Sequence, residues 1–155
     1  MSPTRRGRVP ASTFLGFDYG EKSIGVAVGS THSGQAQDLA TVRVGPTGPD
    51  WQHISRLIQE WKPQALVVGL PLNMDDTENA MTGAAQRFGV RLRDRYNLPI
   101  HMMDERLTTV AAKNSLVESG VPPRRFRSKL DRLAAQAILQ SFLDESSRSV
   151  LEREG

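Results

Sequence analysis

The sequence contains no cysteine. This absence excludes disulfide bonds, zinc sites built on thiolates and cysteine nucleophiles. The sequence also has no apolar run near the roughly 20 residues that a membrane-spanning helix needs. The basic segment 1–11 has no apolar stretch of the kind found in secretory signals. We therefore expect a cytoplasmic protein with no membrane association.

What is present is typical of one globular domain. The chain has 155 residues, of which 38% are hydrophobic and 24% are charged, and it shows no internal repeat and no linker. We expect a disordered extension at 1–12, a folded domain at 13–143 and a charged tail at 144–155. The net charge of +3 and the pI of about 9.7 are compatible with a nucleic-acid partner.

The first part of the domain has the pattern of three consecutive strands. An apolar run at 14–18 ends in an acid, and segment 22–29 places Ile24, Val26 and Val28 at a period of two residues. The residues between these two runs have the length of a hairpin turn. Segment 40–44 alternates again and predicts the third strand, with a loop at 45–49.

Helices and strands then alternate along the chain. Asp50 is a candidate N-cap for a helix whose apolar stripe runs from Ile54 to Trp61, and Pro63 ends this helix. The remaining pattern predicts, in order, a strand at 65–70 covered on both faces, a polar loop at 71–79, a helix over 81–92, a strand at 99–103, a helix over 108–118, a loop at 122–129 and a final helix over 130–142.

This order of elements is typical of an α/β protein. A three-strand meander, followed by strands that helices separate, predicts a mixed five-stranded sheet covered by helices. That is the element order of the ribonuclease H-like fold.

Asp18 is the first candidate for chemistry. It ends a predicted buried strand, so its carboxylate would lie at the edge of the sheet, and Gly20 would let the backbone turn tightly behind it. Ionised oxygens suit Mg²⁺ or Mn²⁺, which prefer hard ligands. Asp18 could equally be an acid that caps a turn.

Further acids stand at expected strand or helix ends. Asp104 and Glu105 follow the fifth predicted strand, and because neighbouring side chains on an extended segment point to opposite faces, only one of them would reach a metal. The alternative for both is a solvated loop or a helix start. Asp131 lies in the first turn of the last predicted helix, where an acid also complements the helix dipole. Together these acids indicate a site better than any one of them does.

Basic and polar side chains provide candidate phosphate contacts. Asn73, in the loop after the fourth strand, could approach a phosphate or could hold a structural turn. Lys22 could neutralise a phosphate or be an ordinary surface lysine. The loop 122–129 concentrates four basic residues, namely Arg124, Arg125, Arg127 and Lys129. We expect this loop to be exposed and mobile and to order on a phosphate backbone, the alternative being a solubilising surface loop.

Four segments of the sequence resemble signature motifs of the YqgF/RuvX family. They are FDYGEKSIGVAVG at 17–29, VVGLPLNMDDTEN at 67–79, DERLTT at 104–109 and KLDRLAAQAIL at 129–139. The similarity covers about 14–142, and four motifs in this order are specific where one alone is not. The family comprises Holliday-junction-resolvase-like proteins that are also described as pre-16S rRNA nucleases.

The resemblance implies a function as well as a fold. A ribonuclease H-like nuclease of this family would use Mg²⁺ or Mn²⁺ to hydrolyse phosphodiester bonds at the 5′ end of pre-16S rRNA during ribosome biogenesis. Branched DNA would be the alternative substrate, and ribosomal particles would be partners. A monomer and a homodimer both fit the sequence.

The resemblance also implies which residues form the site. Asp18, Asp131 and either Glu105 or Asp104 would be the catalytic, metal-binding acids. Related nucleases usually carry an acid at the end of the fourth strand, where this sequence has Gly69-Leu70-Pro71. The site could therefore hold its metals differently, or could bind only one of them well.

Two other functions compete with the nuclease. The segment DYGEKSIGVAV is also similar to the first phosphate loop of the actin-like ATPases, but those proteins clamp a nucleotide between two such lobes and 155 residues account for one. The second rival is a non-catalytic RNA- or ribosome-binding factor on the same fold, because the set of carboxylates is incomplete. Loss of activity in Asp18→Asn would separate an enzyme from such a factor.

Overall fold

Six strands of the chain form one mixed sheet, in the order β4-β3-β2-β1-β5-β6. The computed structural model describes residues 12–73, 75–105 and 123–154, with the side chains of the last helix described from 128 to 146. Along the chain, the elements are β1 (Thr13–Tyr19), β2 (Ser23–Ser30), β3 (Gln35–Gly45), β4 (Gly48–Pro49), α1 (Trp51–Trp61), β5 (Ala65–Leu70), α2 (Ala80–Tyr96), β6 (Ile100–Asp104) and α4 (Pro123–Glu154). β1, β2 and β3 form an antiparallel meander, whereas β5 runs parallel to β1 and β6 runs parallel to β5.

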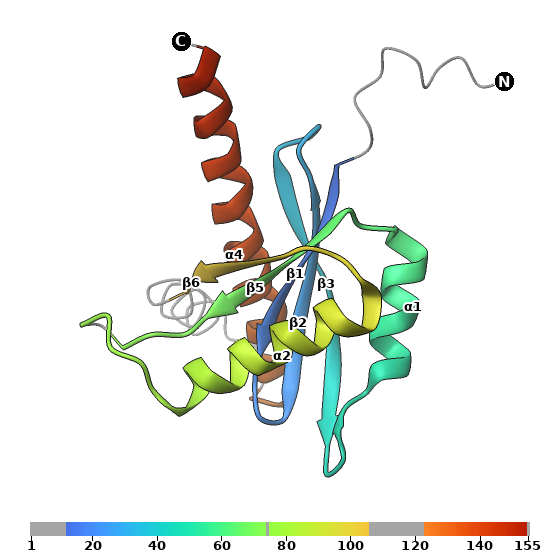
Figure 1. Ribbon diagram of the computed structural model, residues 1–155. Helices are drawn as coiled ribbons and strands as arrows, with labels where there is room; N and C mark the ends of the chain where they lie inside the picture. Colours follow the sequence, from blue (N-terminus) through green and yellow to red (C-terminus); the bar gives the residue numbers. More distant parts are fainter. Residues whose placement is uncertain (1–11, 74, 106–122, 155) are drawn as a thin grey trace, which may run out of the picture.

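Helices cover both faces of this sheet, with α1 and α2 on one face and α4 on the other (Figure 1). Side chains alternate between the two faces along β1. Phe17 and Tyr19 belong to the core beneath α1 and α2. Phe14 packs with residues of α4 in the second core, and by the same alternation Asp18 faces α4. The end of β1 therefore presents an aromatic ring to one layer and a carboxyl group to the other.

Capping interactions fix where α1 and α2 begin. The Asp50 side chain accepts a hydrogen bond from the backbone amide of His53, so the predicted N-cap of α1 is confirmed. α2 begins with a capping box in which the side chains of Asn79 and Thr82 each bond to the other's backbone amide. Thr82 is buried and its hydroxyl also donates to the carbonyl of Pro71. This ties the first turn of α2 to the loop that follows β5.

The predicted fold class is confirmed, with one more strand than predicted. The additional strand β4 is two residues long and pairs antiparallel with the end of β3, inside the segment expected to be a loop. So short a strand has no periodicity of its own, and only its pairing reveals it. β3 begins at Gln35, earlier than its alternation indicated, because its first half is mostly exposed and polar.

The last helix is longer than predicted. α4 begins at Pro123, so the expectation of a mobile loop is wrong for 123–129. A proline in the first turn costs no hydrogen bond, because the first amides of a helix have no acceptor within it. α4 also continues to Glu154 through the segment predicted as a charged tail, and Figure 1 shows its last turns extending past the sheet. Residues 1–11 of the predicted extension 1–12, and the predicted helix 108–118, lie outside the described residues.

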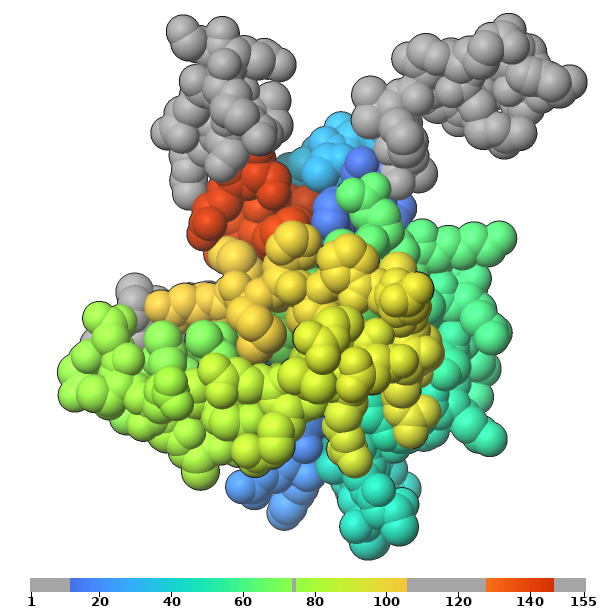
Figure 2. Space-filling model, viewed as in Figure 1, coloured from blue at the N-terminus to red at the C-terminus, as the bar shows by residue number. Residues whose placement is uncertain are grey.

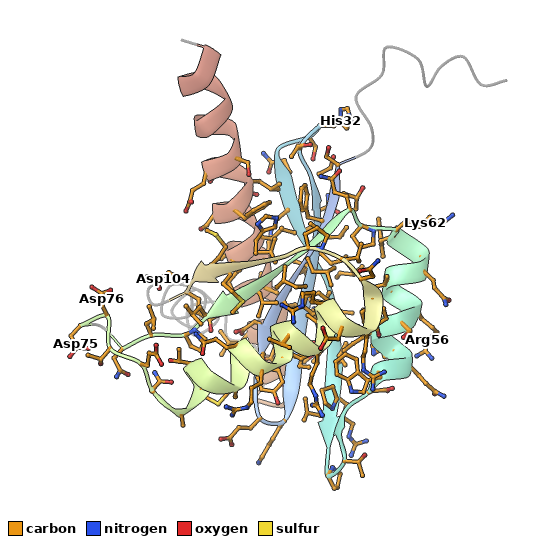
Figure 3. The ribbon with its side chains drawn as sticks, in the orientation of Figure 1. His32, Arg56, Lys62, Asp75, Asp76 and Asp104 are labelled. Carbon is orange, nitrogen blue, oxygen red and sulfur yellow. The ribbon has the colours of Figure 1, made fainter. Side chains whose placement is uncertain are left out.

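No helix in the described ranges has both the length and the apolar character needed to cross a membrane. Figure 2 shows α2 at the surface of the molecule, with the loop between β5 and α2 projecting beside it. The histidine His32 lies in the turn between β2 and β3, at the end of the sheet opposite Asp104 (Figure 3).

Candidate active site

Carboxyl groups from three distant parts of the chain lie near one another beside the end of β1. Asp18 is the penultimate residue of β1, Glu105 directly follows β6, and Asp131 lies in α4. The Asp18 carboxyl forms a side-chain hydrogen bond with Glu105 and is also close enough to Asp131 to be affected by its charge. The structure thus brings together one acid from each of the three positions that the sequence analysis selected.

The sheet and α4 approach each other closely at Gly25. This glycine is the cross-strand partner of Asp18. A Cβ atom on Gly25 would lie 1.8 Å from the backbone carbonyl oxygen of Asp131, so no other residue fits there without moving α4. The hydroxyl of Ser23 donates a hydrogen bond to the Asp131 carboxylate. These contacts hold Asp131 next to Asp18.

Glu105, rather than Asp104, is the acid that faces Asp18. Glu105 is 5% exposed, whereas Asp104 is exposed at the end of β6 (Figure 3). The Oε2 atom of Glu105 is buried and has no hydrogen-bond partner among the described residues. That atom lies 2.7 Å from where a Cβ on Gly69 would stand. The glycine at the end of the fourth predicted strand therefore leaves the space that the Glu105 carboxyl occupies.

Burial and mutual repulsion make these acids hard to ionise. The pKa of Asp18 is raised well above its usual 3.8, first by burial, then by the charge of Glu105, the hydrogen bond to Glu105 and the charge of Asp131. Burial also raises the pKa of Glu105, the hydrogen bond from Asp18 opposes that rise, and the charge of Asp104 adds to it. Burial therefore raises the pKa of both carboxyl groups, and ionising the two together costs more than ionising either one alone.

The chemistry of these side chains fits a divalent cation. Carboxylate oxygens are the ligands that Mg²⁺ and Mn²⁺ prefer. A cation would offset the repulsion between the carboxylates and give the buried Oε2 of Glu105 a partner. Among the described residues, no group of three His, Asp or Glu side chains is arranged so that it could hold a metal ion. We therefore expect the acidic side chains to close further on a bound ion.

Lys22 lies at the opening of this site. It is exposed in the turn between β1 and β2. It lines a cavity of about 440 Å³, which we call the cluster cavity and whose other lining residues are Gly20, Glu21, Ser23, Met81 and Asp131. The ammonium group can therefore meet an anion that enters beside the carboxyl groups.

The other predicted phosphate contacts have different surroundings. The amide of Asn73 donates to the Thr77 hydroxyl at 2.8 Å, and its oxygen accepts from the Asn79 amide at 3.0 Å, so this side chain closes its own loop. Lys129 is exposed on α4. Arg124, Arg125 and Arg127 belong to the first turns of the same helix, and their side chains lie outside the described part of the chain.

The predicted site does not include Ser23, Gly25 or Gly69. A signal for Gly25 existed in the sequence, because pairing the first two predicted strands across their turn places it opposite Asp18. Nothing local indicates that α4 and Glu105 would fill the spaces above the two glycines. Those contacts join residues more than 30 positions apart.

A meander followed by parallel strands, with acids on β1, after β6 and on α4, defines a ribonuclease H-like domain with a carboxylate centre. A family model described as "RuvX: Holliday junction resolvase" matches residues 12–145, and the chain belongs to this family.

Curated relatives support the same assignment. One from Pseudomonas putida KT2440 is 48% identical over 134 residues, covering 86% of this chain and 95% of its own length. One from Neisseria gonorrhoeae FA 1090 is 45% identical over 137 residues, covering 88% and 91%. Both bear the name "Putative pre-16S rRNA nuclease". The solved structure of the fowlpox virus Holliday junction resolvase superposes with a TM-score of 0.53 at 11% identity, covering 86% of this chain and 98% of that one. At this identity it supports the fold alone.

Proposed function

We propose that the chain is a divalent-metal-dependent nuclease that hydrolyses phosphodiester bonds, with Asp18, Glu105 and Asp131 as its metal-binding and catalytic acids. The proposal rests on the nearness of these three carboxyl groups beside β1, where Glu105 and Asp131 both raise the pKa of Asp18. The buried and unpartnered Oε2 of Glu105 supports it, because an isolated buried acceptor is costly unless a ligand satisfies it. Membership of the RuvX family supports nucleic acid as the substrate class.

We assign a distinct part to each residue. Mg²⁺ or Mn²⁺, when bound, would lower the pKa of a water molecule and stabilise the charge on the leaving oxygen. Asp18 and Glu105 would hold this ion from the sheet, and Asp131 would hold it from α4. Ser23 orients the Asp131 carboxylate through its hydrogen bond. Asp104 lies beside this set, and its negative charge opposes the ionisation of Glu105.

Basic residues around the cluster would hold the substrate. Lys22, at the cluster cavity, would contact the phosphate beside the cleaved bond. Arg124, Arg125, Arg127 and Lys129 would contribute contacts to the backbone that do not depend on its sequence. Asn73 would act on the substrate only if its loop opened, because both ends of its amide are engaged.

We propose pre-16S rRNA, near its 5′ end, as the substrate, which places the protein in ribosome biogenesis in the cytoplasm. The name shared by relatives at 45–48% identity over nearly their full length supports this choice. Branched DNA is the second candidate, because the family model is described as a Holliday junction resolvase.

Cleavage assays with both substrates test the proposal. Asp18→Asn, Glu105→Gln and Asp131→Asn should each lower the rate in Mg²⁺ or Mn²⁺ by at least about 100-fold, since loss of a ligand forfeits several kcal/mol of transition-state stabilisation. Asp94→Asn is the matched control, because Asp94 is exposed and pairs only with the neighbouring Arg93 among the described residues.

The outcomes separate the competing functions. Normal cleavage by a folded Asp18→Asn protein would remove Asp18 from the active site. A wild-type protein that binds RNA but cleaves neither substrate with either ion would be a binding factor rather than a nuclease. Preference for the four-way junction over the RNA would replace the proposed substrate and leave the site unchanged.

A further inference from the structure

A ridge of arginines runs along α2. Arg87, Arg91 and Arg95 are spaced four residues apart, so they lie along one stripe of the helix, and all three are exposed. None of them pairs with an acid among the described residues, whereas Arg93 on the same helix pairs with Asp94 at 3.3 Å. Like charges at this spacing repel and destabilise a helix. An anionic partner would offset that cost.

The ridge borders a cavity lined by aromatic rings as well as guanidinium groups. This arginine cavity has a volume of about 350 Å³ and is lined by Tyr19, Ala84, Arg87, Phe88 and Arg91. The rings of Tyr19 and Phe88 are in contact, with centroids 4.9 Å apart. Guanidinium groups bind phosphate in a fixed fork geometry, and aromatic rings stack on bases of any sequence. This combination suits a nucleotide with its base unpaired.

Nearby aromatic packing holds the ridge in place. Arg95 lies over the ring of Trp51 with its guanidinium carbon 4.0 Å from the ring centroid, and Arg91 lies 6.0 Å from the same ring. Cation–π contacts of this kind stabilise a guanidinium group without neutralising its charge. The positive charges of Arg91 and Arg95 are therefore positioned and remain available to an anion.

The arginine cavity adjoins the cluster cavity around the end of β1. Tyr19 directly follows Asp18 and faces the α2 side of the sheet. Tyr19 lines the arginine cavity and the next residue, Gly20, lines the cluster cavity. On α2, Ala84 lines the first and Met81, about one turn earlier, lines the second. A nucleic-acid strand that leaves the carboxyl groups would therefore reach the arginines after it passes the end of β1.

We propose that a single-stranded segment of the nucleic acid, next to the cleaved bond, passes from the cluster cavity around the end of β1 into the arginine cavity. Arg87 and Arg91 bind its phosphates there, and Tyr19 contacts a base. This proposal rests on the proposed nuclease function and adds the form of the substrate, a strand whose flank is unpaired. A cavity of about 350 Å³ has the size of a small-molecule pocket and admits one nucleotide, not a duplex.

Binding without divalent ions tests the path separately from catalysis. The probe is a fluorescent single-stranded RNA of roughly 16 nucleotides, about the largest site size of one single-strand-binding module. Arg87→Gln/Arg91→Gln should shallow the slope of log K against log salt by about 1.4, because each phosphate contact on a single strand contributes about 0.7. At about 0.1 M salt this corresponds to roughly 25-fold weaker binding.

Two matched proteins control for loss of charge. Arg56→Gln/Arg93→Gln removes two positive charges outside the cavity, one from the outer side of α1 (Figure 3) and one from the ion pair with Asp94, and should keep the wild-type slope. Arg87→Lys/Arg91→Lys should keep most of that slope because it retains the charge. An unchanged slope in the double Gln variant, or no binding by the wild type, overturns the path.

A crosslinking experiment locates the strand directly. Because the chain has no cysteine, a single introduced cysteine carrying a benzophenone reports only its own position. Ala84→Cys, in the arginine cavity, should crosslink to the RNA. Val90→Cys, which is 44% exposed and lines a different cavity of α2, should not. Crosslinking at Val90 alone would place the strand elsewhere.

The two proposals can fail independently. If Asp18→Asn abolishes cleavage while Arg87→Gln/Arg91→Gln binds with the wild-type slope, the nuclease stands and the path is wrong. If the slope changes as expected while Asp18→Asn cleaves normally, the arginine cavity binds nucleic acid and the assigned active site is wrong.

Discussion

At the scale of single residues, the site depends on the buried carboxyl groups of Asp18 and Glu105, which are hard to ionise. A carboxyl group in water ionises readily, but burial raises the pKa of both of these carboxyl groups, and their charges repel when both are ionised. Each would be costly to ionise alone, and together they would be costlier still. This arrangement is poor for stability at neutral pH and well suited to capturing a cation.

A pH titration of stability follows from the raised pKa of Asp18. Its folded-state pKa lies above the usual 3.8, so above that pH the folded state holds more protons than the unfolded state. The contribution of Asp18 to the stability of the folded state is fully present below the pKa of Asp18 in the unfolded chain. It is lost as pH rises through the pKa of Asp18 in the folded protein. Cation-free protein should therefore lose melting temperature as pH rises from about 4 through the folded pKa of Asp18, more steeply than Asp18→Asn does.

Thermal melts in a chelating buffer measure this difference. Asp94→Asn is again the matched control, because it removes an exposed carboxyl and should keep the wild-type pH dependence. Parallel curves for wild type and Asp18→Asn would mean that Asp18 ionises normally in the folded protein.

At the scale of elements, glycines in two strands decide how closely the acids can meet. Gly25 in β2 lets α4 approach the sheet, and Gly69 in β5 leaves room for Glu105. Neither lies in a turn, and neither has the positive φ that would demand glycine for its backbone. Their common property is the absence of a side chain on the face where the carboxyl groups gather. The small residues are therefore part of the site although they contribute no chemical group.

Gly25→Ala should damage both the fold and the site. The added methyl group would lie 1.8 Å from a backbone oxygen of α4, so the helix must shift. Overpacking of this kind typically costs about 1–3 kcal/mol, and a clash with backbone is expected at the upper end. Differential scanning calorimetry and the cleavage assay measure the two effects.

Gly45→Ala provides the comparison for that variant. It adds the same methyl group at a strand glycine where nothing lies within 4 Å, so its melting temperature and activity should match the wild type. If Gly25→Ala and Gly45→Ala had the same melting temperature and the same activity, close contact between α4 and β2 at Gly25 would be needed neither for stability nor for cleavage.

At the scale of the whole molecule, the site joins two packing layers. Asp18 and Glu105 belong to the sheet side, and Asp131 belongs to the helix that covers it. A ligand that binds all three links α4 to the sheet, in addition to the apolar contacts of Ile138 and Leu139 in the same core. Binding and folding are therefore expected to be coupled.

Divalent ions should raise the melting temperature of the whole domain. An ion that binds only the folded state adds about 2.7 kcal/mol at one hundred times its Kd. For a chain of this size that corresponds to roughly 5–10 °C. Melts in Mg²⁺ or Mn²⁺, against Na⁺ at equal ionic strength, measure the shift. Asp18→Asn should show little of it, and an equal shift in that variant would locate the ion elsewhere.

Local patterns in the sequence determined much of this protein. The meander, the strand at 65–70 and the N-cap at Asp50 follow from side-chain period and capping chemistry, which act over a few residues. The acids at the ends of these elements could be selected as candidates for the same reason, since an element's end is itself a local feature.

Only the tertiary structure decided which of those candidates meet. Alternation places Asp104 and Glu105 on opposite faces, but only the packing of β6 beside β5 turns Glu105 toward Asp18. The glycines that admit α4 and Glu105, and the aromatic neighbours of the arginines on α2, are likewise contacts between elements far apart in the chain. Period and capping fix the elements one at a time, whereas register and packing between them determine which side chains share a space.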